Sequence, residues 1–93
     1  MKDKESYYCL GVGGMGMTPL ALYLAQAGHQ VAGQDRALNE KNRLLLEAGG
    51  VTVEDWNLNR EVPDAHFVIS SAISAHNPFF IRAQEAGVRV SRR

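Results

Sequence analysis

Short apolar runs recur along the 93-residue chain, and segments with helical periodicity separate most of them. Glycine, proline or polar residues bound these runs, which is typical of strands that end in turns. The first run is apolar at successive positions, and this pattern suits a strand covered on both faces, as in a parallel sheet. The pattern predicts five strands, at residues 7–12, 30–34, 51–54, 66–70 and 88–91.

Three further segments carry apolar residues three and four positions apart, the spacing of a helix with one buried side. They predict helices at residues 15–27, 40–48 and 79–86. Asn39 and Asn77 are suitable N-caps for the second and third helices, with Pro78 at the first helical position, and a glycine follows each helix. The buried side of the second helix is predicted to consist of Leu44, Leu45 and Ala48.

Strands that alternate with helices predict an α/β fold with a parallel sheet. The connection between the third and fourth strands, residues 55–64, is polar and is expected to be a loop. Right-handed crossovers then give a Rossmann-like, three-layer domain whose five-stranded sheet has the order 3-2-1-4-5. In this order the loops after the first and fourth strands flank one crevice, and Asp35, after the second strand, closes its other side.

A glycine-rich loop follows the first strand and contains Gly11, Gly13, Gly14, Met15 and Gly16. Its first, second and last glycines have the G-x-G-x-x-G spacing, and a strand, a helix and an acid lie where a nucleotide-binding βαβ unit has them. Unpaired N–H groups and partial positive charge at a helix start bind phosphate, and glycine lets the phosphate approach the backbone. No Lys-Ser or Lys-Thr follows, so the loop predicts a diphosphate ester and not a site of γ-phosphate transfer. The alternative is a tight turn without a ligand.

Polar residues at the carboxyl ends of two strands extend this candidate site. Asp35 is the residue type that accepts hydrogen bonds from a ribose diol; the alternative is an aspartate that starts a turn or caps the next helix. Arg36 can stack on a base or pair with a phosphate, or else be a solvated surface residue. The stretch after the fourth strand lies on the rim where open parallel sheets bind ligands, and comprises Ser70, Ser71, Ala72 and Ile73.

Composition narrows the classes of function. Ten Lys and Arg balance ten Asp and Glu, so no basic surface is available for a nucleic-acid backbone. The length suits a single domain. The first six residues are polar and no apolar run is long enough to span a membrane, so neither a secretory signal nor a membrane partner is expected, and the predicted location is the cytoplasm.

The remaining reactive residues are expected to have structural roles. Cys9, the single cysteine, excludes an internal disulfide and is predicted to be a small buried residue. Trp56 is predicted to pack against the core and not to stack on a ligand. Met17 is predicted to lie in the core, whereas the pattern does not decide between a core position and a ligand contact for Met15. His76 is the only histidine on the ligand side. No spacing of histidine, cysteine or carboxylate residues indicates a metal site or a catalytic triad.

Four motifs together resemble the N-terminal domain of the Mur ligase family. They are Gly-Val-Gly-Gly-Met-Gly-Met at residues 11–17, Gln-Val-Ala-Gly-Gln-Asp at 30–35, Ser-Ser-Ala-Ile with Asn-Pro at 70–78, and Gly-Val-Arg-Val-Ser-Arg at 87–92. The similarity covers nearly the whole chain, and it is greatest to the branch that joins L-alanine to UDP-N-acetylmuramate. Gln34 stands where the family often has a serine, and residues 51–64 follow no family pattern.

The resemblance implies that residues 1–93 form a UDP-binding domain. The glycine loop would face the diphosphate, while Asp35, Arg36 and residues 70–73 would hold the uridine. The complete enzyme would use ATP and magnesium to convert the lactyl carboxylate of UDP-N-acetylmuramate into an acyl phosphate, which the amine of L-alanine then attacks, in peptidoglycan biosynthesis. The family's ATP loop, magnesium ligands and amino-acid site lie in other domains. The chain is therefore expected to be a fragment that needs no cofactor of its own and has no ligase activity by itself.

Three alternatives stay open. A related ligase recycles a tripeptide onto UDP-N-acetylmuramate. The NAD-binding half of an oxidoreductase uses the same helix start and acid, although the 70–78 stretch favours the ligase. A nucleotide-sensing or protein-interaction module would bind a nucleotide without chemistry.

Overall fold

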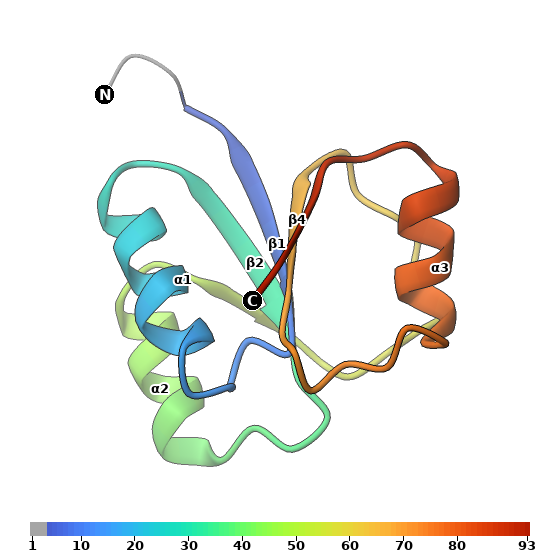
Figure 1. Cartoon of the computed structure of the whole chain (residues 1–93). Coiled ribbons are helices and arrows are strands. Elements are labelled where there is room, and N and C mark those ends of the chain that lie inside the picture. Colours follow the sequence, from blue (N-terminus) through green and yellow to red (C-terminus); the bar gives the residue numbers. More distant parts are fainter. Residues whose placement is uncertain (1–3) are drawn as a thin grey trace.

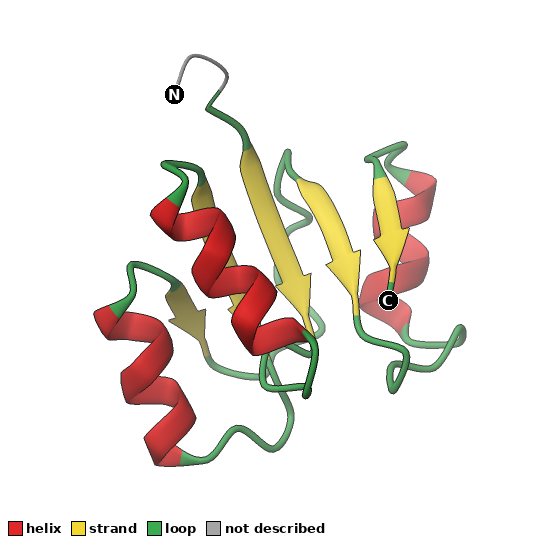
Figure 2. Cartoon of the chain, turned by 60° about the vertical axis from the view of Figure 1, so that its left-hand side comes forward, coloured by secondary structure: helices red, strands yellow, loops and turns green. Residues whose placement is uncertain are grey.

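Five strands form one parallel sheet in the computed structural model, which describes residues 4–93. The strand order is β3-β2-β1-β4-β5, which confirms the predicted order and fold class. All strands point the same way, so the loops that follow them gather at one edge (Figure 2). In chain order the elements are β1 (Ser6–Leu10), α1 (Met17–Gln26), β2 (Gln30–Gln34), α2 (Glu40–Ala48), β3 (Thr52–Glu54), β4 (His66–Ile69), α3 (Pro78–Glu85) and β5 (Val90–Arg92).

The helices form two outer layers: α1 and α2 cover one face of the sheet, and α3 covers the other (Figure 1). A hydrophobic core lies on each face of the sheet, between the strands and the helices. Successive side chains of a strand point to opposite faces, so β1 contributes residues to both cores. Cys9 packs with Met17 of α1 on the first face, whereas Tyr8 and Leu10 pack with Phe79 of α3 on the second. Burial on both faces explains the continuous apolar run that predicted this strand.

The first strand ends two residues earlier than predicted, at Leu10 and not at residue 12. Gly11 has a φ of +86°, a conformation that side chains disfavour, and this residue turns the chain out of the sheet. The amides of Gly11 and Val12 both donate to the carbonyl oxygen of Gln34, at 2.9 and 3.2 Å. The glycine loop is thus tied to the end of β2.

Helix α1 begins at Met17, two residues later than predicted. The carbonyl oxygen of Gly14 accepts from the amides of Met17 and Thr18, at 3.0 and 3.1 Å, so the loop closes as a turn before the helix starts. Helices α2 and α3 have the predicted Asn39 and Asn77 caps. Four other elements have bounds that differ by one or two residues from the predicted ranges 51–54, 66–70, 79–86 and 88–91. In the structure β3 starts at Thr52, β4 ends at Ile69, α3 spans Pro78–Glu85 and β5 spans Val90–Arg92.

The prediction for the buried side of α2 was wrong. Leu44 and Leu45 are 57% and 51% exposed, and Ala48 is also exposed, whereas Leu46 is fully buried against α1 and the sheet. Three consecutive leucines cover more than half of a helix circumference, because each residue advances about 100°. The sequence alone therefore could not select which leucine faces inward.

Candidate functional site

The glycine loop runs close to the end of β4, and its first glycine makes this approach possible. A Cβ atom on Gly11 would lie 2.6 Å from Cβ of Ser70, a distance that real Cβ atoms do not tolerate. Gly16 differs, because a Cβ atom there would meet no protein atom within 4 Å and its backbone φ is −89°. Packing therefore explains Gly11, but it does not explain Gly16.

Asp35 fixes the loop from the end of β2. Its Oδ2 accepts from the amide of Gly13 at 2.8 Å, and its Oδ1 accepts from the amide of Ala37 at 2.9 Å. The second bond is the turn that was the alternative role for this aspartate. A carboxylate has about four lone-pair sites, so each oxygen can accept a further hydrogen bond from a ligand.

The loop leaves two backbone donors free. The Gly14 amide donates to the Gly11 carbonyl at 3.0 Å, and the Gly13 amide is held by Asp35. Among residues 4–93, the amides of Met15 and Gly16 have no hydrogen-bond acceptor. Helix α1 also lacks a side-chain cap, unlike α2 and α3, so these donors stand at the positive end of its dipole. An anion is the group that satisfies such donors.

A crevice of about 510 Å³ lies at the carboxyl edge of the sheet, beside this loop. Of the residues predicted for the site, it is lined by Gly11, Gly13, Gly14, Asp35, Arg36, Ser70, Ala72 and Ile73. A smaller hollow of about 280 Å³ next to it is lined by Met15, Gly16, Met17, Ser70, Ser71 and Arg93. The structure thus brings all the predicted site residues to one edge, and Ser70 borders both spaces.

Ser70 is the buried polar residue between the two spaces. Only 8% of it is exposed, and its Oγ accepts from the Ala72 amide at 3.2 Å. Its amide donates to the carbonyl of Leu10, which extends the β1–β4 pairing by one bond. The backbone of Ser70 is therefore held by the sheet, and its hydroxyl by the Ala72 amide.

The crevice also has lining residues that sequence reasoning did not assign to it: Ala37, Trp56, Ser74 and Asn77. Trp56 is half-buried and packs against the core on the α3 side, which confirms its predicted packing role, yet it also borders the crevice. Asn77 combines its predicted cap with a place in the wall. His76, by contrast, is exposed and does not line the crevice. Met15 is 95% exposed, whereas Met17 is buried as predicted.

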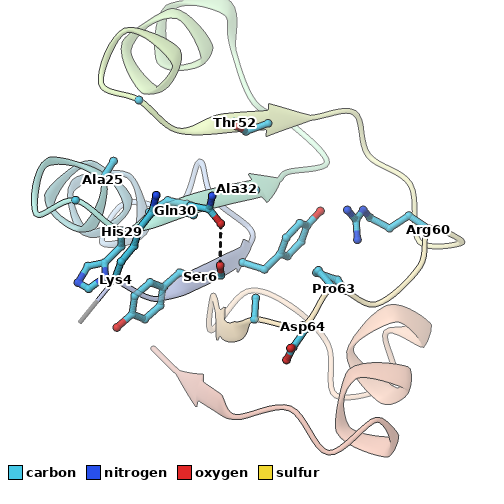
Figure 3. Close-up of a pocket in the computed structure, with 16 residues that line it drawn as sticks. Lys4, Ser6, Ala25, His29, Gln30, Ala32, Thr52, Arg60, Pro63 and Asp64 are labelled. Carbon is cyan, nitrogen blue, oxygen red and sulfur yellow. Dashed lines mark hydrogen bonds between the residues drawn. The ribbon is translucent and has the colours of Figure 1, made fainter. Parts of the chain in front are cut away.

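A second large hollow, of about 470 Å³, lies near the amino ends of the strands and is drawn in Figure 3. Lys4 and His29 lie at one end of it and Arg60 at the other, and the Ser6 hydroxyl donates to Oε1 of Gln30 at 3.0 Å. Arg60 is paired with Glu54, whose carboxylate lies 2.8 Å from its Nε. Ligands of open parallel sheets bind at the carboxyl ends of the strands, so this hollow is not the candidate site.

Groups with shifted pKa values lie in the core or at the amino edge, away from the crevice. Burial raises the pKa of the Cys9 thiol to about 12. Burial and a hydrogen bond to Glu54 raise the pKa of the Tyr8 hydroxyl. Burial, followed by the charge of Arg89, lowers the pKa of His66.

Within residues 4–93, no three His, Cys, Asp or Glu side chains are grouped so that they could hold a metal ion. None of the helices in that range combines the length and the apolar character that crossing a membrane requires.

Solved structures of similar proteins share this fold. Over 96% of this chain, UDP-N-acetylmuramate-alanine ligase MurC from Thermotoga maritima is 25% identical, with a TM-score of 0.79. Over 94% of the chain, a murein peptide ligase from Psychrobacter arcticus is 27% identical, with a TM-score of 0.82. UDP-N-acetylmuramate:L-alanyl-γ-D-glutamyl-meso-diaminopimelate ligase from Neisseria meningitides matches 97% of the chain with a TM-score of 0.82, and at 22% identity it shows the fold alone.

These matches concern one part of each larger protein. The chain spans 21%, 18% and 29% of the lengths of the three solved proteins, in the order given. The sequence itself also matches a family model described as "Mur ligase family, catalytic domain", over residues 6–93. That match covers nearly all of the chain, and the chain therefore belongs to the Mur ligase family.

Proposed function

We propose that this chain is the N-terminal domain of a ligase and binds the UDP moiety of UDP-N-acetylmuramate. The observation that carries the proposal is the pair of free amides, Met15 and Gly16, at the uncapped start of α1 beside a crevice of about 510 Å³. Membership of the Mur ligase family supports the choice of a muramyl nucleotide over other diphosphate esters.

The two spaces at the carboxyl edge suggest how the ligand divides between them. The diphosphate would occupy the smaller hollow, where the free amides, the Ser71 hydroxyl and the positive end of α1 favour negative charge. The nucleoside would occupy the crevice, with the Asp35 carboxylate accepting from the ribose hydroxyls and Arg36 near the base. Ser70, which borders both spaces, would lie at the junction of ribose and phosphate. Gly13 and Gly14, whose amides are already used, would provide clearance and not hydrogen bonds.

In the whole enzyme, the role of this domain would be to hold and orient the substrate. ATP would transfer its γ-phosphoryl group to the lactyl carboxylate, releasing ADP, and the amine of L-alanine would displace phosphate from the acyl phosphate to form the amide. We propose that ATP, magnesium and the amino acid are held by domains outside these residues. The domain would supply binding energy and position, so that the carboxylate meets ATP in a productive geometry.

A second candidate function differs in the amine that is joined to the muramyl carboxylate. The murein peptide ligase is 27% identical to this chain and the alanine ligase 25%, so attachment of a tripeptide is the second candidate. Both reactions start from UDP-N-acetylmuramate, and the two candidates therefore share the same site in this domain. An NAD-binding domain would also use the start of α1 and Asp35. It would differ from both ligase candidates in that the crevice would accept NAD and not a uridine nucleotide.

Calorimetric titration of the 93-residue chain separates these ligands. We expect UDP-N-acetylmuramate and UDP to bind with similar affinity, because the domain faces mainly the UDP part, and uridine and NAD to bind more weakly. Affinity in the millimolar range is compatible with the proposal, since the other walls of the substrate site would lie in other domains. Tighter binding of NAD than of UDP-N-acetylmuramate would contradict it.

A further inference from the structure

The polar side chain of Gln34 is fully buried at the end of β2. Its Nε2 donates to the Tyr8 hydroxyl at 2.8 Å and to the Asn57 carbonyl at 3.2 Å, and its Oε1 accepts from the Asn57 amide at 2.9 Å. A buried amide is costly unless its groups are paired, and here both donors and the acceptor are used. Gln34 therefore fixes both backbone polar groups of one residue in the loop between β3 and β4.

Further side chains hold the same loop, which crosses from β3 to β4 without a helix. The Tyr8 hydroxyl donates to Glu54 at 2.6 Å, and Glu54 pairs with Arg60, whose Nε lies 2.8 Å from Oε1. Arg82 of α3 donates to the backbone carbonyls of Leu58 and Arg60. The loop is thus anchored from β1, β2 and α3, and its conformation is set before any ligand binds.

These anchors place Trp56, the neighbour of Asn57, at the crevice. Its side chain is half-buried, packs against the core on the α3 side and lines the crevice together with Asp35 and Ile73. An aromatic ring at a nucleotide crevice offers a surface on which a base can stack. Because the ring is already held, stacking would cost little ordering.

We propose that Trp56 forms the aromatic wall against the nucleobase, and that Gln34 is the residue that positions it. The inference rests on the proposed function and adds the residue that contacts the base. It also gives Gln34 a role, because its side-chain amide reaches across to the backbone of Asn57, beside Trp56. Trp56 acts on the base end of the ligand only, so it leaves the diphosphate end unaffected.

Trp56 is the only tryptophan of the chain, so its fluorescence reports on the crevice directly. UDP and inorganic pyrophosphate are titrated separately, and binding is followed by tryptophan emission and by amide NMR shifts. We expect UDP to quench the emission and pyrophosphate to shift the loop amides without quenching. In Trp56→Leu, UDP should bind about tenfold more weakly, equivalent to about 1.4 kcal/mol, with pyrophosphate affinity unchanged.

The positioning role is tested with Gln34→Met, which keeps the length of the side chain and removes its hydrogen bonds. We expect weaker UDP binding with pyrophosphate affinity retained, and no further loss when Gln34→Met is added to Trp56→Leu, because Gln34 acts through the ring. If Gln34→Met does not fold, Tyr8→Phe, which removes one partner of the Gln34 amide, should show the same pattern at a smaller size. Equal losses for UDP and pyrophosphate would overturn the positioning role.

The outcomes also separate this inference from the proposed function. If UDP binds by NMR while Trp56 emission and the affinity of Trp56→Leu stay unchanged, Trp56 is not the base wall, and UDP binding itself stands. If neither UDP nor pyrophosphate shifts the loop amides of the wild-type chain, both the inference and the proposed function are overturned.

Discussion

Replacing Gly16 by alanine tests whether the start of α1 binds the diphosphate. A Cβ atom at this position would contact no protein atom within 4 Å, and the backbone is in the right-handed helical region, so the fold should accept the change. Alanine is a poorer N-cap than glycine, and the expected cost in unfolding free energy is below about 1 kcal/mol. The new methyl group would stand in the hollow next to the free amides of Met15 and Gly16.

The expected loss of affinity follows from the donors that the methyl group would obstruct. Hydrogen bonds to a charged group contribute about 1.5 kcal/mol each at the low end of their range, so two of them amount to about 3 kcal/mol. This corresponds to binding of UDP-N-acetylmuramate that is about a hundredfold weaker. Calorimetry or NMR titration measures the affinity, and urea unfolding measures the stability of the same sample.

Gly87→Ala is the matched control for stability. Gly87 has a φ of +77° and follows α3, outside both the crevice and the hollow, and alanine there should destabilise the fold by about 1 kcal/mol through backbone strain. Its affinity for the ligand should match that of the wild-type chain. Affinity of Gly16→Ala within threefold of the wild type, or an equal loss in Gly87→Ala, would refute the assignment of the diphosphate to these amides.

Three further predictions concern the fold. Leu46→Ala should lower the unfolding free energy in urea by about 2–5 kcal/mol, while Leu45→Ala changes it by less than about 1 kcal/mol; equal effects would contradict the observed face of α2. Cys9 is buried with a raised pKa, so it should react with a disulfide reagent only after unfolding, and rapid modification of the native chain would count against this burial. The pKa of His66 is lowered in the folded state, so the unfolded chain binds a proton at this residue at a higher pH than the folded chain does. The free energy of unfolding should therefore fall as the pH drops below about 6.5, and it should fall less in His66→Gln. An unchanged pH dependence in that variant would exclude His66 as the source.

Local pattern was sufficient to predict the fold. The apolar strands, the asparagine caps and the glycine stops all act between near neighbours in sequence, and they correctly predicted the strands and both capped helices. The rule of right-handed crossovers then correctly predicted the order of the strands in the sheet. The errors occurred where a distant contact decides the outcome. The first strand ends early because its following amides bond to the carbonyl of Gln34, and one of three adjacent leucines is buried because α2 packs on α1.

The candidate site was predictable by residue type, but its hydrogen bonding was not. Asp35 and the glycine loop were expected at the same edge, yet the bond from the Gly13 amide to Asp35 spans 22 positions and determines which amides remain free. Trp56 was expected only to pack, because its place in the crevice depends on bonds from Gln34 to Asn57 across 23 positions. Such long-range bonds leave no trace in the local pattern of a single sequence.

A crystal structure of the chain with UDP-N-acetylmuramate tests the central claim most directly. The diphosphate oxygens should lie within hydrogen-bonding distance of the Met15 and Gly16 amides, with the nucleoside in the crevice between Asp35 and residues 70–73. A diphosphate bound elsewhere, such as in the hollow at the amino ends of the strands, would contradict the claim that the start of α1 holds the ligand.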